Sequence, residues 1–305
     1  MFASDEIPVL GAMSALDAAM KLRELGEDEL AARLEGAQLD LRGSKPARSS
    51  LWPFQDKPWQ YTEHAFGYIK AGSSTEDQPL VSAASIRADK NLLNSQIKIT
   101  LNRLHVANYP GGNEHHILFE FSARNQAQAV AEDAHYSVSL RAREGQSAAL
   151  VGIPIFVGLN VGQEGVAFKC QTINVKNTED ERLIEFMDSH PFRTGLELMK
   201  TVQPALVPLS QMVGGLAKAL LKRARNVKVQ EFNLGLDFGN VPMSARMAEG
   251  AYVIVQIPDT LKEDWDWRDW IYRPVTGNIV SADDLTTRLP FNYLVLGISR
   301  LRKEE

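Results

Sequence analysis

The sequence predicts an α+β fold that is mainly β: an antiparallel β-sandwich with an α-helical insertion and an N-terminal helical hairpin. Three observations predict this fold. Apolar and polar residues alternate over long stretches, as they do in half-buried strands. Short turn sequences separate these stretches, and strands and helices do not alternate regularly, so antiparallel pairing is favoured. A helical period interrupts the strands only in the middle of the chain.

The composition is that of an ordinary globular protein. The chain has 305 residues, 44% of them hydrophobic, with 33 Lys and Arg against 38 Asp and Glu and a net charge of -5. These values exclude collagen-like, wholly disordered and polytopic membrane proteins. The acidic balance disfavours nucleic acid as a partner. The first residues lack the basic and apolar regions of a signal peptide, so we expect a cytoplasmic protein.

The first element expected is a helical hairpin over residues 1–36. Ser14 is placed to cap its first helix, and apolar residues recur at helical spacing from Leu16 to Leu25. Gly26 then interrupts the period, and a second short helix follows. We expect this hairpin to be a small cap on the main domain, with a separate protein-docking module as the alternative.

Residues 37–79 are expected to form a linker that carries aromatic side chains. Glycine, proline and serine residues break any regular period between residues 37 and 60. The side chains of Trp52, Phe54 and Trp59 are too large to stay exposed, so they should lie against a surface. Because that surface belongs either to this chain or to a partner, these three residues are candidate partner-binding residues.

Residues 80–305 are expected to form the sandwich itself. Apolar residues alternate in 96–106, where Arg103 is the least regular member of the pattern, and again in 116–124. The turn sequence from Tyr109 to Asn113 separates these two strands, so we expect them to pair as a hairpin. Further strands are expected at 135–141, 153–161, 166–175, 227–238, 252–257, 279–280 and 293–301.

A helical insertion is expected at about 178–225. Apolar residues recur at steps of three and four from Leu196 to Leu220, and prolines should divide this stripe. A basic cluster follows it, and its cations could simply meet the helix dipole. Together with the stripe they could also contact an anionic membrane surface, or the stripe could bind a partner helix. The candidate contact residues are Lys218, Lys222, Arg223, Arg225 and Lys228.

Three tryptophans, Trp265, Trp267 and Trp270, lie among acidic residues near the C-terminal strands. One interpretation is a turn that closes the sandwich, with at least one indole anchored in the core. The other is a contact site for a protein or a carbohydrate, because tryptophan is favoured at interface hot spots. The acids between them lack the spacing of a calcium-binding loop, so we expect no metal there.

No catalytic constellation is recognisable in the sequence. The adjacent His115 and His116 should face opposite ways on a strand, which hinders chelation of one metal. The single cysteine, Cys170, excludes an internal disulfide and lies in an alternating strand, where a buried and unreactive thiol is the normal outcome. Nucleophile-elbow and phosphate-loop motifs are absent. We therefore expect no catalytic residues and no cofactor.

These observations favour a non-enzymatic protein-interaction or adaptor module whose partner is another protein. One alternative is a membrane-associating or membrane-active protein that uses the amphipathic 192–225 helix with its basic end. Another is a hydrolase whose site is assembled from distant loops. The predicted hairpin at 96–124 resembles the opening strands of C2-type sandwiches, which implies lipid or protein docking, although the loop acids of calcium-dependent C2 domains are not identifiable.

Overall fold

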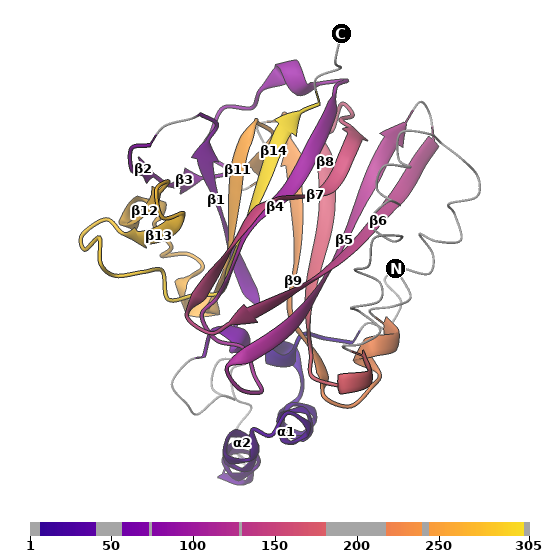
Figure 1. Ribbon diagram of the computed structural model, residues 1–305, viewed down its shortest axis with the longest axis vertical. Coiled ribbons are helices and arrows are strands. Elements are labelled where there is room, and N and C mark those ends of the chain that lie inside the picture. The colour runs from indigo at the N-terminus through magenta and orange to yellow at the C-terminus, as the bar shows by residue number, and fades with distance from the viewer. Residues whose placement is uncertain are drawn as a thin grey trace.

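The computed structural model describes residues 7–40, 57–72, 75–127, 130–180, 218–239 and 244–301. Two large sheets pack face to face, and two helices lie at one end (Figure 1). The predicted sandwich, mainly β and antiparallel with an N-terminal helical pair, is therefore confirmed.

The first large sheet has six strands in the order β3-β1-β11-β14-β4-β7. Neighbouring strands in it are antiparallel, and β4 lies inside the sheet between β14 and β7. Its strands are β1 (Glu63–Lys70), β3 (Val81–Ser82), β4 (Gln96–Val106), β7 (Gln146–Asn160), β11 (Gly250–Ile257) and β14 (Tyr293–Arg300).

The second large sheet has five strands in the order β10-β9-β8-β5-β6. Its pairs are antiparallel except for the short parallel pair of β9 with β10. Its strands are β5 (Glu114–Ala127), β6 (Val130–Arg143), β8 (Val166–Val175), β9 (Asn226–Asp237) and β10 (Ala245–Arg246).

A third, smaller sheet has the order β13-β12-β2, with β2 (Gln78–Pro79), β12 (Trp270–Arg273) and β13 (Asn278–Ser281). It flanks the six-stranded sheet on the side away from the five-stranded sheet (Figure 1). Ile279 of β13 belongs to the same buried cluster as Val253 of β11 and Val295 of β14. The six-stranded sheet therefore has a covered outer face in addition to its inner face.

The main core lies between the two large sheets. Apolar residues two apart along each strand share the inner face, as the predicted alternation requires. The residues that fill this core include Ile97, Ile99 and Leu101 of β4, Leu294, Leu296 and Ile298 of β14, and Ile117, Phe119 and Phe121 of β5.

The predicted pairing of 96–106 with 116–124 is wrong. β4 pairs with β7 and β14, whereas β5 pairs with β6 and β8, so the two strands lie in different sheets. The turn between them crosses from one sheet to the other. Turn residues specify that the chain reverses, but they do not specify which strand the returning segment pairs with.

The segment expected to be a linker contributes a strand to the sandwich. β1 lies within residues 37–79 and pairs with β11 over its whole length. Just before it, Trp59 in a short 3₁₀ helix (Pro58–Gln60) is 0% exposed and belongs to the main core. Prolines and short polar loops around this strand hide its alternation. Residues 41–56, with Trp52 and Phe54, lie outside the described residues.

The N-terminal helices are α1 (Ala15–Glu24) and α2 (Asp28–Asp40). The Ser14 hydroxyl accepts a hydrogen bond from the Asp17 amide at 3.2 Å, which is the predicted N-cap. The Glu27 carboxylate accepts a hydrogen bond of 3.0 Å from the Gly111 amide in the β4–β5 connection. The helical pair is thereby fixed to one end of the sandwich (Figure 1).

Only the two ends of the predicted insertion are described. Residues 178–180 and 218–221 are helical, and residues 181–217 lie outside the described ranges. Leu220 and Leu221 pack against Leu118, Ile173 and Val175 on the outer face of the five-stranded sheet. No helix in the described ranges is long and apolar enough to cross a membrane.

Candidate functional site

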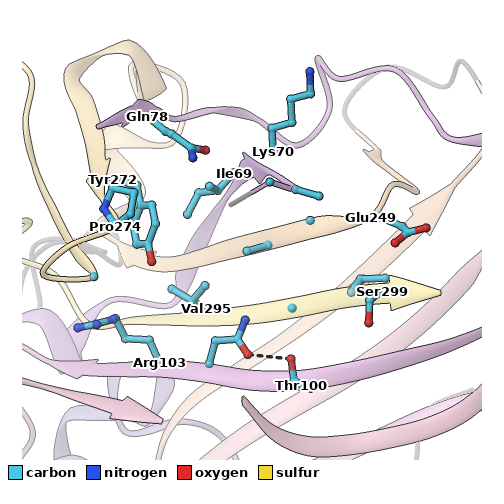
Figure 2. A pocket seen from close by; sticks show the side chains of 18 of the residues that line it. Ile69, Lys70, Gln78, Thr100, Arg103, Glu249, Tyr272, Pro274, Val295 and Ser299 are labelled. Carbon is cyan, nitrogen blue, oxygen red and sulfur yellow. Dashed lines mark hydrogen bonds between the residues drawn. The ribbon is translucent and has the colours of Figure 1, made fainter. Parts of the chain in front are cut away.

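A groove of about 690 Å³ lies on the outer face of the six-stranded sheet, beside the three-stranded sheet (Figure 2). Its volume is within the range of natural ligand sites. β11 and β14 form the floor, β4 forms one wall and the end of β1 the other, and the β12–β13 turn stands at one end. The polar lining includes Lys70, Thr100, Asn102, Arg103, Glu249 and Tyr272.

The floor of the groove consists of small residues. Ala251 of β11 and Gly297 of β14 are direct partners in the antiparallel pairing. A Cβ atom at Gly297 would lie 2.6 Å from both Thr100 Oγ1 and Asn102 Nδ2. The missing side chain therefore leaves room for these two polar groups to lie over the sheet. The Thr100 hydroxyl donates a 2.7 Å hydrogen bond to Asn102 Oδ1.

A β-bulge in β4 determines which side chains reach the groove. Leu101 is opposite Leu296 and Arg103 is opposite Val295, so Asn102 has no partner on β14. Without the bulge, Arg103 would share the inner face with Leu101. With it, Arg103 lies on the outer face and lines the groove, while Leu104 enters the main core.

Arg103 connects the sheet to the β12–β13 turn. Its Nη2 donates a hydrogen bond to the Thr276 carbonyl oxygen at 3.2 Å. Gly277, at φ +64°, allows this approach, because a Cβ there would overlap the guanidinium. Arg103 is only 9% exposed. Among the described residues, no carboxylate forms an ion pair with it.

The neighbourhood of Arg103 is electropositive. His105 follows on the same outer face, and its ring stacks on that of Tyr293 with centroids 4.8 Å apart. Burial, with smaller contributions from the charges of Arg288 and Arg103, lowers the pKa of His105 to about 4. Figure 2 shows Glu249 and Lys70 away from Arg103, so the other end of the groove carries charges of both signs.

The lining can bind polar groups, and its side chains are those of polar, charged and apolar residues. Guanidinium, amide, hydroxyl and phenol groups can donate hydrogen bonds into the groove. The residues that line it include neither histidine nor cysteine, so Thr100 and Ser299 have no imidazole base there. In the described part of the chain, no group of three His, Cys, Asp or Glu could hold a metal ion.

The tryptophan cluster covers the sheet next to the groove. Trp265 stacks on Trp270 at 5.9 Å and meets Trp267 edge-on at 5.5 Å. Trp267 is 7% exposed, and a Cβ at Gly67 of β1 would lie 2.6 Å from its ring. The cluster therefore encloses a second core on the outer face. Contact with a partner stays a prediction for these residues, of which Trp265 and Trp270 are half-buried.

The basic residues proposed to contact a membrane do not form a single surface. Lys218 and Lys222 are exposed, whereas Arg223 pairs with Asp180 at 2.7 Å. Arg225 is exposed with its backbone at φ +67°. Lys228 is 3% exposed on β9, and its Nζ lies 2.6 Å from Glu231 Oε2. Lys228 is thus placed to stabilise the sheet, and membrane contact stays a prediction for the set.

Cys170, His64 and His116 are not among the residues that line the groove. Cys170 lies in the main core, and burial raises the pKa of its thiol well above the usual range. Burial lowers the pKa of His64 to about 4, so its imidazole is neutral at pH 7. The Nε2 atom of His116 lies 3.0 Å from Ser139 Oγ. His190 lies outside the described residues.

The groove was not recognised from the sequence. One local signal existed: Arg103 interrupts the apolar alternation of a strand with polar residues at Thr100 and Asn102. No such signal marks Glu249 or Tyr272, which reach the groove through pairings between distant strands.

No protein-family model, curated protein or solved structure matches this chain. The function proposed below therefore depends on the geometry and chemistry of the groove.

Proposed function

We propose that this chain is a non-enzymatic protein-interaction module that holds a segment of its partner in the outer groove. The proposal depends on the groove itself. It is lined by polar side chains, it is built on a sheet, and it lies beside the buried cluster of the outer face. Strands position binding groups more exactly than loops do. The Asn102 bulge, the Arg103–Thr276 hydrogen bond and Gly297 all act to keep this recess open and polar.

The rim of the groove favours a macromolecular partner. Val275, at the tip of the β12–β13 turn, lines the groove and is 82% exposed. An apolar side chain next to donors and acceptors provides the mixed contact surface of a protein interface. The groove also opens to solvent, so a segment belonging to a larger molecule could lie in it.

The proposal can be tested by filling the groove. Gly297→Leu would place a side chain over the floor and displace Thr100 and Asn102. Gly235→Leu is the matched control, because Gly235 also lies in a strand but a Cβ there meets open space. Ser299→Trp, at an exposed lining position, is a second filling variant if Gly297→Leu does not fold.

Partner capture with the full chain gives the readout. We expect a protein retained by the wild type and by Gly235→Leu to be lost from a folded filling variant. Equal retention by all of these proteins would contradict the proposal. Binding to anionic vesicles that is unaffected by Ser299→Trp but abolished by charge reversal at Lys222 and Arg223 would favour the membrane-associating alternative instead.

A further inference from the structure

Arg103 is a buried cation whose counter-ion is missing from the described part of the chain. Its guanidinium has five N–H donors, and its contact with the described residues is one hydrogen bond to the Thr276 carbonyl oxygen. Buried charges in proteins are normally paired, because an unpaired one costs desolvation energy without compensation. A carbonyl oxygen orients the guanidinium but does not neutralise it. Since the described residues supply no such group, a ligand in the groove is the candidate that we consider.

We infer that the groove binds an extended acidic peptide segment whose carboxylate pairs with Arg103. This inference rests on the proposed function and specifies the chemistry of the partner. A guanidinium fixed on one side by Thr276 can offer its remaining donors to a carboxylate in a bidentate arrangement. Figure 2 shows the Tyr272 hydroxyl pointing toward the floor near Val295, the residue paired with Arg103. That phenol is a further donor at this end.

The shape of the floor fits an extended chain. The groove follows β14 from Val295 to Ser299, a length of about 13 Å at the usual rise per residue. An extended peptide of about four residues spans that length. Ala251 and Gly297 in the middle of the floor leave space for a peptide backbone to approach the sheet.

The charge pattern argues for a peptide over a polyanion. Glu249 and Lys70 line the groove away from Arg103, so that end carries charges of both signs and lacks the continuous positive charge that a polyanion needs. A segment with a carboxylate near Arg103 and a neutral or basic residue near Glu249 matches both ends. Nucleic acid matches only one end, and the chain carries a net charge of -5.

Selection from a displayed library of random peptides, followed by synthesis of the recovered sequences, tests the inference. The full chain should enrich Asp or Glu at one position, and Arg103→Gln should weaken binding of the recovered peptide about tenfold or more. Arg103→Lys should give an intermediate affinity because it keeps the charge without the bidentate geometry. Arg288→Gln is the control, since Arg288 is exposed and does not line the groove.

A second readout separates pairing from a loss of structure. A carboxylate on Arg103 would offset part of the positive field at His105, so peptide binding should raise the His105 pKa from about 4. A phosphorylated analogue of the peptide that binds much more tightly would overturn the carboxylate assignment. Recovered peptides that lack acidic enrichment, or that bind Arg103→Gln as tightly as the wild type, would overturn the inference. Loss of their binding in Ser299→Trp would still show that they bind in the groove. Failure of every groove-dependent interaction would overturn the proposed function as well.

Discussion

The outer face of the six-stranded sheet has two halves that differ along the same strands. On β11 the outward residues change from Val255 and Val253 to Ala251, and on β14 they change from Val295 to Gly297 and Ser299. The large residues lie under the three-stranded sheet and the tryptophans, with Val295 at the boundary, and the small ones line the groove. The size of the outward side chains thus marks where the cover ends, and it separates the half that stabilises the fold from the half available for binding.

This difference has an energetic basis. Burial of apolar surface contributes roughly 25 cal/mol per Å², so the covered half stabilises the fold, whereas Ala251 and Gly297 bury little side chain. Substitutions should therefore affect stability strongly in the covered half and binding mainly in the open half.

The largest effect is expected from Trp267→Ala in the covered half. The indole is buried against Gly67 and Trp265, and its removal should lower the free energy of unfolding by about 3–5 kcal/mol. Trp270→Ala, at a half-buried position of the same cluster, should cost clearly less. Urea denaturation measures both. A Trp267→Ala variant as stable as the parent would show that the tryptophans do not support a core.

The next effect is the pH dependence contributed by His105. Its pKa in the folded chain is lowered to about 4, so the folded state favours the neutral ring. The stabilisation that the neutral ring gives the folded state is complete above pH 6.5, which is about the pKa of histidine in the unfolded chain. This stabilisation is lost as the pH falls from there toward 4. The full span corresponds to roughly 3 kcal/mol.

His105→Gln should therefore reduce the loss of stability between pH 7 and pH 4.5. His64, whose pKa burial also lowers to about 4, keeps part of the dependence in this variant. Urea unfolding at the two pH values gives the comparison. An unchanged pH dependence would mean that His105 is solvated in the folded protein, contrary to its place in the covered half.

A smaller effect is expected at the boundary between the halves. Gly277→Ala adds a methyl group that overlaps the Arg103 guanidinium at a residue with positive φ. Gly145→Ala is the matched control, with φ +69° and open space at the Cβ position. Backbone strain should lower the free energy of unfolding of each variant by about 1 kcal/mol. Gly277→Ala should lose more than this because its methyl group also overlaps the guanidinium. Equal losses in thermal denaturation would indicate that Arg103 does not hold the turn.

The smallest effect on stability is expected in the open half. Val275→Ser replaces an exposed side chain on the groove rim and should change the free energy of unfolding by less than about 0.5 kcal/mol. It should nevertheless weaken partner binding, because an apolar contact is lost. Titration calorimetry with the recovered peptide checks this, and unchanged affinity would exclude the rim from the binding surface.

The sequence predicted the sandwich because alternation and turn residues are local signals. The same signals could not assign partners, so the expected pairing of 96–106 with 116–124 was wrong. β1 was missed because Pro58 and the polar loop after residue 70 mask a short strand. The wrong pairing concerns contacts between segments that are distant along the chain, and the missed strand concerns a local signal that is too short.

The candidate site was predictable only in part. Arg103 was visible as an irregular residue in an alternating strand, and the bulge at Asn102 explains why. The tryptophans were recognised as a cluster, but their place beside the groove depends on the third sheet. Glu249 and Tyr272 carry no local signal, because only the assembled strands bring them to one groove.

Site-specific photo-cross-linking tests the central claim most directly. A benzophenone side chain at Val275, on the exposed rim of the groove, is compared with one at Asn233, an exposed position on the outer side of β9. Our account predicts that the partner cross-links through position 275 and that position 233 gives no comparable product. Cross-linking through position 233 alone, or equally through both, would contradict it.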